Sequence, residues 1–467
     1  MSNKKGQLSN KVWIALIMFM FMGSIAAGVE SMYIGLYLNN TAFKNGSMGA
    51  SLTLTDTINL IASLSAVVSG IATFAMGTLS EKMKNRKLFI SVGYIIWGIF
   101  MLLFSFVRGG NVGRFFGLTE MSEIITTTAI IIIAFSLVLA FLRSTTGDAA
   151  FSSWVTDVST PETSAKIETA FTIMGFVATG VITYFVSTAE LGKIEYNEIS
   201  IIFGISAIVL GVLGFSLITN PPKVKKSKKE RRLEKTKVES SYWEDLFYGF
   251  KPSVIKENKN LYLMLSSGCL FNCAYQVFYP YLFIYLVSVV IPENKGVNLF
   301  SGKALFTIII ALIVTAISVL LLMKSYAKSK TIPFIISVLC FTLGLFILSS
   351  TKNILGIIIG LAPGLIGYII IMIQFGATVR DNVPKDKVGL FQGIRLIFLF
   401  FVPRIIGPTL GNIAAKNSDV TYMENGAEKV LPTEAMFLYA AIISALIFIP
   451  MLAFLKKDKE KALKEKN

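Results

Sequence analysis

The 467-residue chain is 54% hydrophobic and 15% charged, with a mean hydropathy of +0.67. A soluble fold cannot bury that much apolar surface, because single cores stop growing at about 250–300 residues, so the composition predicts an integral membrane protein. A formal net charge of +16 is also found in proteins that bind nucleic acid, but most Lys and Arg residues here fall between apolar runs. That positive-inside pattern favours the lipid bilayer as partner and excludes nucleic acid.

The side chains available for chemistry are few. There is no His and there are three Cys; Cys269 and Cys273 lack companions at metal-ligand spacing, so we expect no metal site and no cofactor. Any proton relay must therefore use carboxylates. The sequence has no phosphate-binding loop with the required spacing, and we expect a protein that is not an enzyme.

Apolar runs of about 20 residues, enough to cross a bilayer, predict twelve membrane-spanning helices. Both termini then lie on one side, and Lys4, Lys5, Lys11 and the Lys-rich C-terminal tail mark it as the cytoplasmic side of the cell membrane. The predicted spans are 12–38, 57–79, 88–107, 126–156, 164–189, 199–219, 260–290, 303–323, 331–350, 354–378, 388–415 and 433–455.

A basic segment that opens Pro221-Pro222-Lys223-Val224-Lys225-Lys226 divides these spans into two sets of six. We therefore predict an all-α membrane protein with an N-terminal six-helix bundle (1–220), a cytoplasmic linker (221–259) and a C-terminal six-helix bundle with a basic tail (260–467). The two halves also share a sequence pattern. Asp157 ends span 4 and Asp381 ends span 10, and each precedes a helix with paired glycines, as in transporters built from repeats.

The loop between spans 2 and 3 reads Gly77-Thr78-Leu79-Ser80-Glu81-Lys82-Met83-Lys84-Asn85-Arg86-Lys87. It resembles the loop signature of the major facilitator superfamily, with Asn85 where that family usually has Gly. The resemblance implies the major facilitator fold and solute transport by alternating access. Gly77, Glu81 and Arg86 would then belong to a conformational switch, together with Arg143, Asp157 and Asp381.

Within that superfamily, Asp148 to Lys166 and Val383 to Gly393 resemble the glycoside–pentoside–hexuronide cation symporters. The group carries an acid after a Gly in span 1, an acid in span 4 and a cation in span 11. Glu30, Asp148 and Arg404 match these positions. The carboxylates that the group has in span 2 are replaced by Ser69-Gly70-Ile71-Ala72-Thr73.

Ionisable residues inside a span are costly and usually face a cavity or a partner. Glu30, Tyr33 and Tyr37 are spaced to share one helical face, which suits sugar hydroxyls or an amine; a carboxylate that only holds helices together is the alternative. Asp148 is a candidate for substrate or proton binding. Arg143, five residues earlier and about 140° round an α-helix, is expected to seek its partner on another span, as a switching counter-ion or a substrate contact.

Two more sets of candidates lie in the C-terminal half. Arg404 is favoured over Arg395 because Gly407 and Gly411 allow close helix approach beside it, with a structural ion pair as the alternative. Asn272, Gln276 and Tyr279 follow one face of span 7 up to Pro280, where a helix break is expected, and are candidates for substrate or cation binding.

These observations predict a secondary transporter, monomeric, that moves a small and sugar-like solute with a coupled proton or sodium ion. The alternatives are an exporter of drugs or metabolites from the same superfamily, and a non-transporting membrane receptor or scaffold. The last would need a soluble output domain, whereas the longest polar stretch here is the central linker. The sequence leaves the solute, the direction of transport and the ion open.

Overall fold

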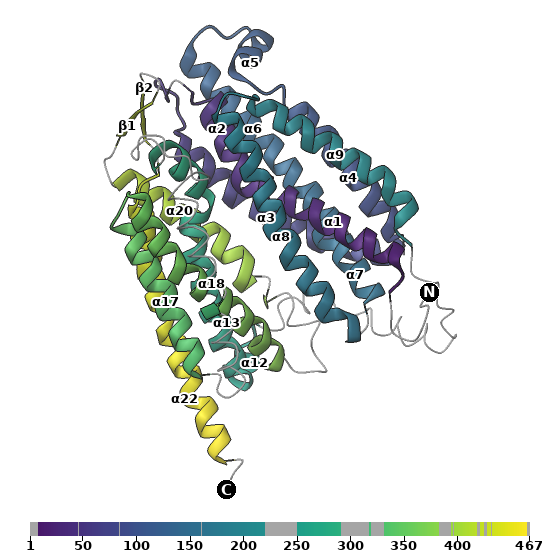
Figure 1. Ribbon diagram of the computed structural model, residues 1–467, viewed down its shortest axis with the longest axis vertical. Coiled ribbons are helices and arrows are strands. Elements are labelled where there is room, and N and C mark those ends of the chain that lie inside the picture. Colours follow the sequence, from purple (N-terminus) through teal and green to yellow (C-terminus); the bar gives the residue numbers. More distant parts are fainter. Residues whose placement is uncertain are drawn as a thin grey trace. The chain divides into compact units, whose positions relative to one another are not determined.

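The computed structural model describes twelve stretches of the chain, with some residues inside them described by their backbone only (Figure 1). All structural statements below refer to this part of the protein. The described stretches are 8–44, 46–83, 85–159, 161–219, 250–290, 317–318, 331–382, 394–395, 397–417, 421–424, 427–430 and 432–464.

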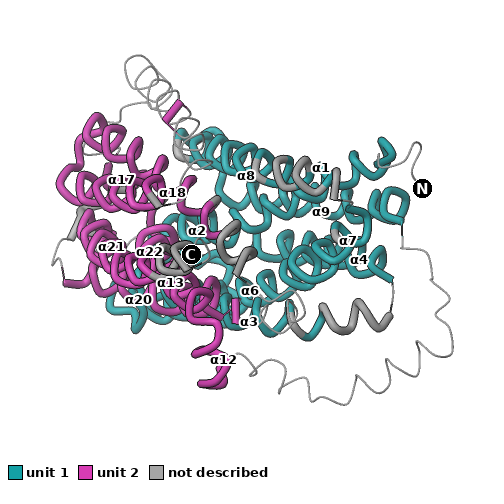
Figure 2. The backbone as a smooth tube through the Cα atoms, turned by 90° about the horizontal axis from the view of Figure 1, so that it is seen from below, with its two compact units in different colours: residues 1–224, 423–429 teal, residues 225–422, 430–467 magenta. Residues whose placement is uncertain are grey.

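The chain divides into two compact units, coloured separately in Figure 2. Unit 1 is Met1–Val224 with Met423–Lys429, and unit 2 is Lys225–Tyr422 with Val430–Asn467. The boundary falls within the segment predicted as a linker. Residues 220–249 lie outside the described residues, so the cytoplasmic linker stays a prediction.

Unit 1 is built from helices that run from residue 10 to residue 217. Three of its helical segments follow one another without a loop to make the first span, and three more make the fourth. The elements are α1 (Asn10–Gly28), η1 (Val29–Tyr33), α2 (Ile34–Thr41), α3 (Leu54–Met83), α4 (Arg86–Phe104), α5 (Gly109–Phe116), α6 (Met121–Arg143), η2 (Ser144–Phe151), α7 (Ser152–Val158), α8 (Pro161–Glu190) and α9 (Tyr196–Leu217).

Unit 2 is also helical. The loop before its last span forms a two-stranded sheet, and residues Met423–Lys429 of this loop are grouped with unit 1. That hairpin is the one departure from the all-α prediction in the described residues. The elements are α12 (Pro252–Glu257), α13 (Lys259–Phe278), η4 (Tyr279–Tyr281), α14 (Leu282–Tyr285), η5 (Leu286–Val290), α17 (Thr331–Ser349), α18 (Ile354–Asn382), η6 (Ile397–Phe401), α20 (Val402–Asn417), β1 (Thr421–Glu424), β2 (Ala427–Val430), α21 (Ala435–Leu446) and α22 (Phe448–Lys464).

Every predicted span except the eighth coincides with helix in the described residues; span 303–323 lies outside them apart from Ile317 and Ser318. Ten of the described helices are long and apolar enough to cross a membrane. The apolar stretch Ile173–Ala189 of α8 is shorter than the others. In the ten windows 33% to 61% of the residues are buried in the protein, which leaves broad apolar surface for lipid.

Local sequence accounts for two helix starts. The Ser9 hydroxyl accepts a hydrogen bond from the Val12 amide at the start of α1. At the start of α4 the Asn85 side chain accepts one from the Leu88 amide at 3.3 Å. Ser and Asn are preferred at this position because they satisfy amides that the first helical turn leaves unbonded. Asn85, which departs from the family signature, thus caps α4.

The two units repeat the same helix pairings. In unit 1, α1 packs on α8 and α4 packs on α9, which are the first span on the fifth and the third on the sixth. In unit 2, α13 packs on α20 and α17 packs on α21, the corresponding pairs. This agrees with the repeat that the sequence predicted.

Glycines bring several of these helices into backbone contact. A Cβ added at Gly98 of α4 would lie 2.5 Å from the Gly204 carbonyl oxygen of α9, and one at Gly211 would lie 2.6 Å from the Ser91 carbonyl oxygen. In unit 2, a Cβ on Gly407 would collide with Gln276 and one on Gly411 with the Val277 carbonyl. The predicted close approach of helices at Gly407 and Gly411 is confirmed.

Gly211→Ala is therefore expected to lower the thermal stability of the purified protein in detergent, because α4 and α9 must separate to admit the methyl group. Overpacking of this kind costs about 1–3 kcal/mol. Gly180→Ala is the matched control, since a Cβ at Gly180 of α8 meets nothing within 4 Å. Equal unfolding temperatures for the two variants would contradict the packing described here.

Candidate functional site

Three ionisable side chains meet inside unit 1. Arg143, the last residue of α6, donates from Nε to Glu30 Oε2 at 2.7 Å and from Nη1 to Asp148 Oδ2 at 3.1 Å. The side chains of Arg143 and Glu30 are 10% and 14% exposed, and that of Asp148 is 43% exposed. One guanidinium therefore serves two carboxylates, and the more accessible of the two is Asp148.

The backbone explains why these residues meet. Glu30 lies in the π-helical segment η1, and Asp148 lies in a second one, η2, which begins directly after Arg143. A π-helix bonds each residue to the fifth one along, so it brings residues five apart onto one side. The expectation that Arg143 finds a partner on another span is confirmed by Glu30. The expectation that Arg143 and Asp148 are poorly placed to pair is wrong, because it assumed α-helical geometry where the chain makes a wider turn.

Hydroxyl groups complete the surroundings of Arg143. Its Nη2 lies 3.5 Å from Ser69 Oγ on α3 and 3.5 Å from Ser144 Oγ. Ser69 belongs to the stretch where the symporter group carries carboxylates. Apart from that alignment, no residue pattern selects Ser69. The cluster thus joins the first and fourth spans through one positive and two negative side chains, and reaches the second span through the Ser69 hydroxyl.

Tyr33 and Tyr37 lie close to Glu30 in the sequence, but their hydroxyls bond to other helices. The buried Tyr33 hydroxyl bonds to the Tyr196 carbonyl and lies 2.6 Å from Ser200 Oγ on α9. The buried Tyr37 hydroxyl donates to the Val107 carbonyl at 3.1 Å. These contacts give both tyrosines a packing role, and their part in substrate binding stays a prediction.

In unit 2 the predicted helix break is confirmed, since α13 ends at Phe278 and the 3₁₀ turn η4 contains Pro280. The Asn272 amide donates to the Gly268 carbonyl of its own helix at 2.8 Å. Gln276 packs against Gly407. Their assignment to a substrate or cation site, with that of Tyr279, stays a prediction.

An aromatic cluster surrounds Tyr279. Its ring stacks on Tyr275, with centroids 4.5 Å apart, and Tyr275 lies 5.1 Å from the ring of Tyr368 on α18. Neither partner was predicted from the sequence. The spacing of Tyr275 and Tyr279, one helical turn apart, was a usable signal, whereas nothing local to Tyr368 indicates the contact.

Arg404 lies on α20, half-buried, whereas Arg395 is exposed. Of the two arginines, the one favoured from the sequence thus has the less exposed side chain. Gly407 and Gly411 hold α20 against α13 just beyond Arg404. The assignment of Arg404 to substrate or cation binding stays a prediction.

The residues predicted to form a switch are partly described. Arg86 Nε lies 3.2 Å from Asp157 Oδ2, which ties the start of α4 to the end of α7. Their side chains are 10% and 29% exposed. Gly77 and Glu81 lie in α3 and Asp381 in α18, and the side chains of Glu81 and Asp381 are outside the described part of the chain.

Solved structures of several membrane transporters are similar to this chain over most of its length. The solved structure of the nucleoside transporter NupG has a TM-score of 0.65 at 14% identity and covers 96% of this chain and 100% of its own. A bacterial homologue of the lysosomal transporter Spinster, inward-facing, has a TM-score of 0.60 at 14% identity and covers 96% and 99%. The xylose transporter XylE from E. coli has a TM-score of 0.58 at 11% identity and covers 94% and 97%.

At these identities the solved structures establish a shared fold and nothing finer. A sequence search among curated proteins found no match. The family model described as "Major Facilitator Superfamily" matches residues 12–408. The match spans most of the chain, including the Gly77–Lys87 loop, Arg143 and Arg404, and the chain therefore belongs to the Major Facilitator Superfamily of membrane transporters.

Proposed function

We propose that this protein is a secondary transporter that moves a small, polar, sugar-like solute with a coupled cation by alternating access. The observation that carries the proposal is the Glu30–Arg143–Asp148 cluster. It holds two carboxylates against one guanidinium, so its net charge is negative, and Asp148 is accessible enough for a proton or sodium ion to reach it. Buried charge of this kind inside a span usually marks an ion or substrate path.

The similar structures support the solute class. They include a nucleoside transporter and a D-xylose–proton symporter, whose solutes carry sugar hydroxyls. Carboxylates and hydroxyls, as in the cluster around Arg143, suit such groups because each hydroxyl both donates and accepts hydrogen bonds. Transport at the cell membrane with both termini in the cytoplasm is part of the same proposal.

Export of an apolar drug or metabolite is the second candidate. The Tyr275–Tyr279–Tyr368 cluster of unit 2 favours it, because stacked aromatic rings offer flat apolar faces. Thermal-shift screening of the purified protein against sugars, nucleosides, amino acids and lysolipids, with and without sodium, separates the two candidates and supplies the solute for the experiments below.

Neutralising both carboxylates, Glu30→Gln with Asp148→Asn, is expected to abolish accumulation of the solute in proteoliposomes. One charge crossing 100 mV supplies about 2.3 kcal/mol, enough for roughly 50-fold accumulation. The double variant lacks both carboxylates that are proposed to carry that charge. Glu123→Gln on the exposed end of α6 is the control and should accumulate normally. Undiminished accumulation by the double variant would refute the assignment of the coupling site.

A double-mutant cycle tests Arg143. Arg143→Gln leaves the Glu30 carboxylate buried without its cation, and removing one partner of a buried pair costs about 3–5 kcal/mol. Combining it with Glu30→Gln should recover part of that stability in thermal unfolding of the purified protein. Losses that simply add would show that the 2.7 Å contact does not persist in solution.

The Arg86–Asp157 pair is expected to affect turnover rather than solute affinity. Asp157→Asn should slow exchange transport with little change in the half-saturating concentration, because the pair lies at the helix ends and away from the Arg143 cluster. The charge exchange Arg86→Asp with Asp157→Arg should restore part of the rate. A large shift in apparent affinity with an unchanged maximal rate would exclude a role in the conformational change.

A further inference from the structure

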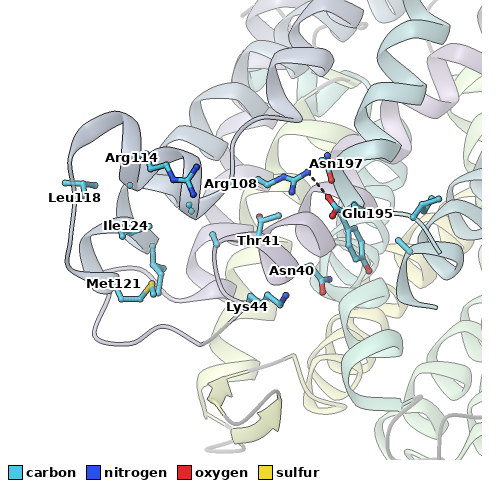
Figure 3. Close-up of a pocket in the computed structure, with 18 residues that line it drawn as sticks. Asn40, Thr41, Lys44, Arg108, Arg114, Leu118, Met121, Ile124, Glu195 and Asn197 are labelled. Atoms are coloured by element: carbon cyan, nitrogen blue, oxygen red, sulfur yellow. Dashed lines mark hydrogen bonds and ion pairs between the residues drawn. The ribbon is translucent and has the colours of Figure 1, made fainter. Parts of the chain in front are cut away.

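A second site lies in unit 1, formed by segments that the transport proposal does not use. It is a pocket of about 670 Å³ between the end of α2, the helix α5, the start of α6 and the loop that leads into α9 (Figure 3). None of Glu30, Arg143 or Asp148 lines it. It lies at the Thr41 end of the first span, away from Asn10.

The pocket is positively charged. Lys44, Arg108 and Arg114 line it from three different segments, as the sticks in Figure 3 show. The single carboxylate among the described lining residues, Glu195, accepts a hydrogen bond from Arg108 Nη2 at 2.9 Å. Its charge is thereby compensated, and Lys44 and Arg114 remain in excess. Gly109 and Gly110, at the amide end of α5, add the positive end of a helix dipole.

The other wall of the pocket is apolar and includes Leu118, Met121 and Ile124. A ligand that fills the pocket must therefore present an anionic group to the cations and hydrocarbon to this wall. A free inorganic ion satisfies only the first requirement. An amphiphile with an anionic headgroup satisfies both.

The helix α5 indicates where the pocket lies relative to the bilayer. Val112 and Gly113 are buried, and a Cβ at Gly113 would lie 3.1 Å from Ile124 of α6, so this face packs on the unit. Phe115 and Phe116, the last two residues of α5, are 83% and 54% exposed. A short helix with exposed aromatic rings next to basic residues is typical of the membrane interface, at the depth of the lipid headgroups.

We propose that this pocket binds the phosphate headgroup of an anionic phospholipid from the leaflet that faces the Thr41 end of unit 1. Lys44, Arg108 and Arg114 contact the phosphate oxygens, and the acyl chains leave along Leu118, Met121 and the exposed rings of α5. Phosphate is well matched by guanidinium and ammonium donors. The bound lipid connects the ends of α2 and α9 to α5. This proposal is independent of the identity of the coupling ion and of the transported solute.

The test measures how fast a water-soluble acylating reagent modifies Lys44 in the wild-type protein in nanodiscs, with peptides quantified by mass spectrometry. Lys193 is the internal reference, because it is exposed in the loop before α9 but does not line the pocket. The nanodiscs contain either phosphatidylcholine alone or phosphatidylcholine with phosphatidylglycerol. A third arm adds soluble glycerol 3-phosphate to the phosphatidylcholine nanodiscs.

Phosphatidylglycerol is expected to slow modification of Lys44 several-fold relative to Lys193, since only the unoccupied fraction of the pocket reacts. Arg114→Gln should remove most of that protection, and Lys11→Gln, an exposed lysine at the other end of the first span that does not line the pocket, should leave it intact. Equal slowing of both lysines, which a bulk surface potential produces, would overturn the proposal. So would protection by glycerol 3-phosphate alone, and so would unchanged protection in Arg114→Gln.

Discussion

The contact between the Arg143 guanidinium and the carboxylates of Glu30 and Asp148 is the constraint on which the proposed mechanism depends. A guanidinium stays charged at every accessible pH and offers five donors in a rigid plane, so it holds two carboxylates and two serine hydroxyls at once. A cation that binds Asp148 competes with Arg143 for the same oxygens. In the proposed mechanism, this competition links the arrangement of the first, second and fourth spans to ion binding.

Two π-helical segments make this contact possible. They interrupt spans that are otherwise α-helical, at Val29–Tyr33 and at Ser144–Phe151. Short π-helical stretches are rare within α-helices and occur frequently at functional sites. Here the wider turn of η2 brings Asp148 to Arg143. Tyr33, at the end of η1, bonds through its hydroxyl to α9.

Apolar runs and the Gly77–Lys87 loop were sufficient to predict the helices and the family, because both signals are local in the sequence. The close approach at Gly407 and Gly411 followed from residue size alone. The pairing of Arg143 with Asp148 was missed because no residue pattern in Ser144–Phe151 indicates a π-helix. The Tyr275–Tyr368 contact and the pocket around Arg108 were missed because residues far apart in the chain form them.

The most direct test of this account is infrared difference spectroscopy of the protein in lipid, recorded while the proton or sodium concentration is changed without solute. Binding of the coupling cation to the cluster alters the stretching bands of a carboxylate. The account predicts a carboxylate signal in the wild-type protein that is lost in Asp148→Asn. The same signal in both proteins would contradict it, because the cation would then bind elsewhere.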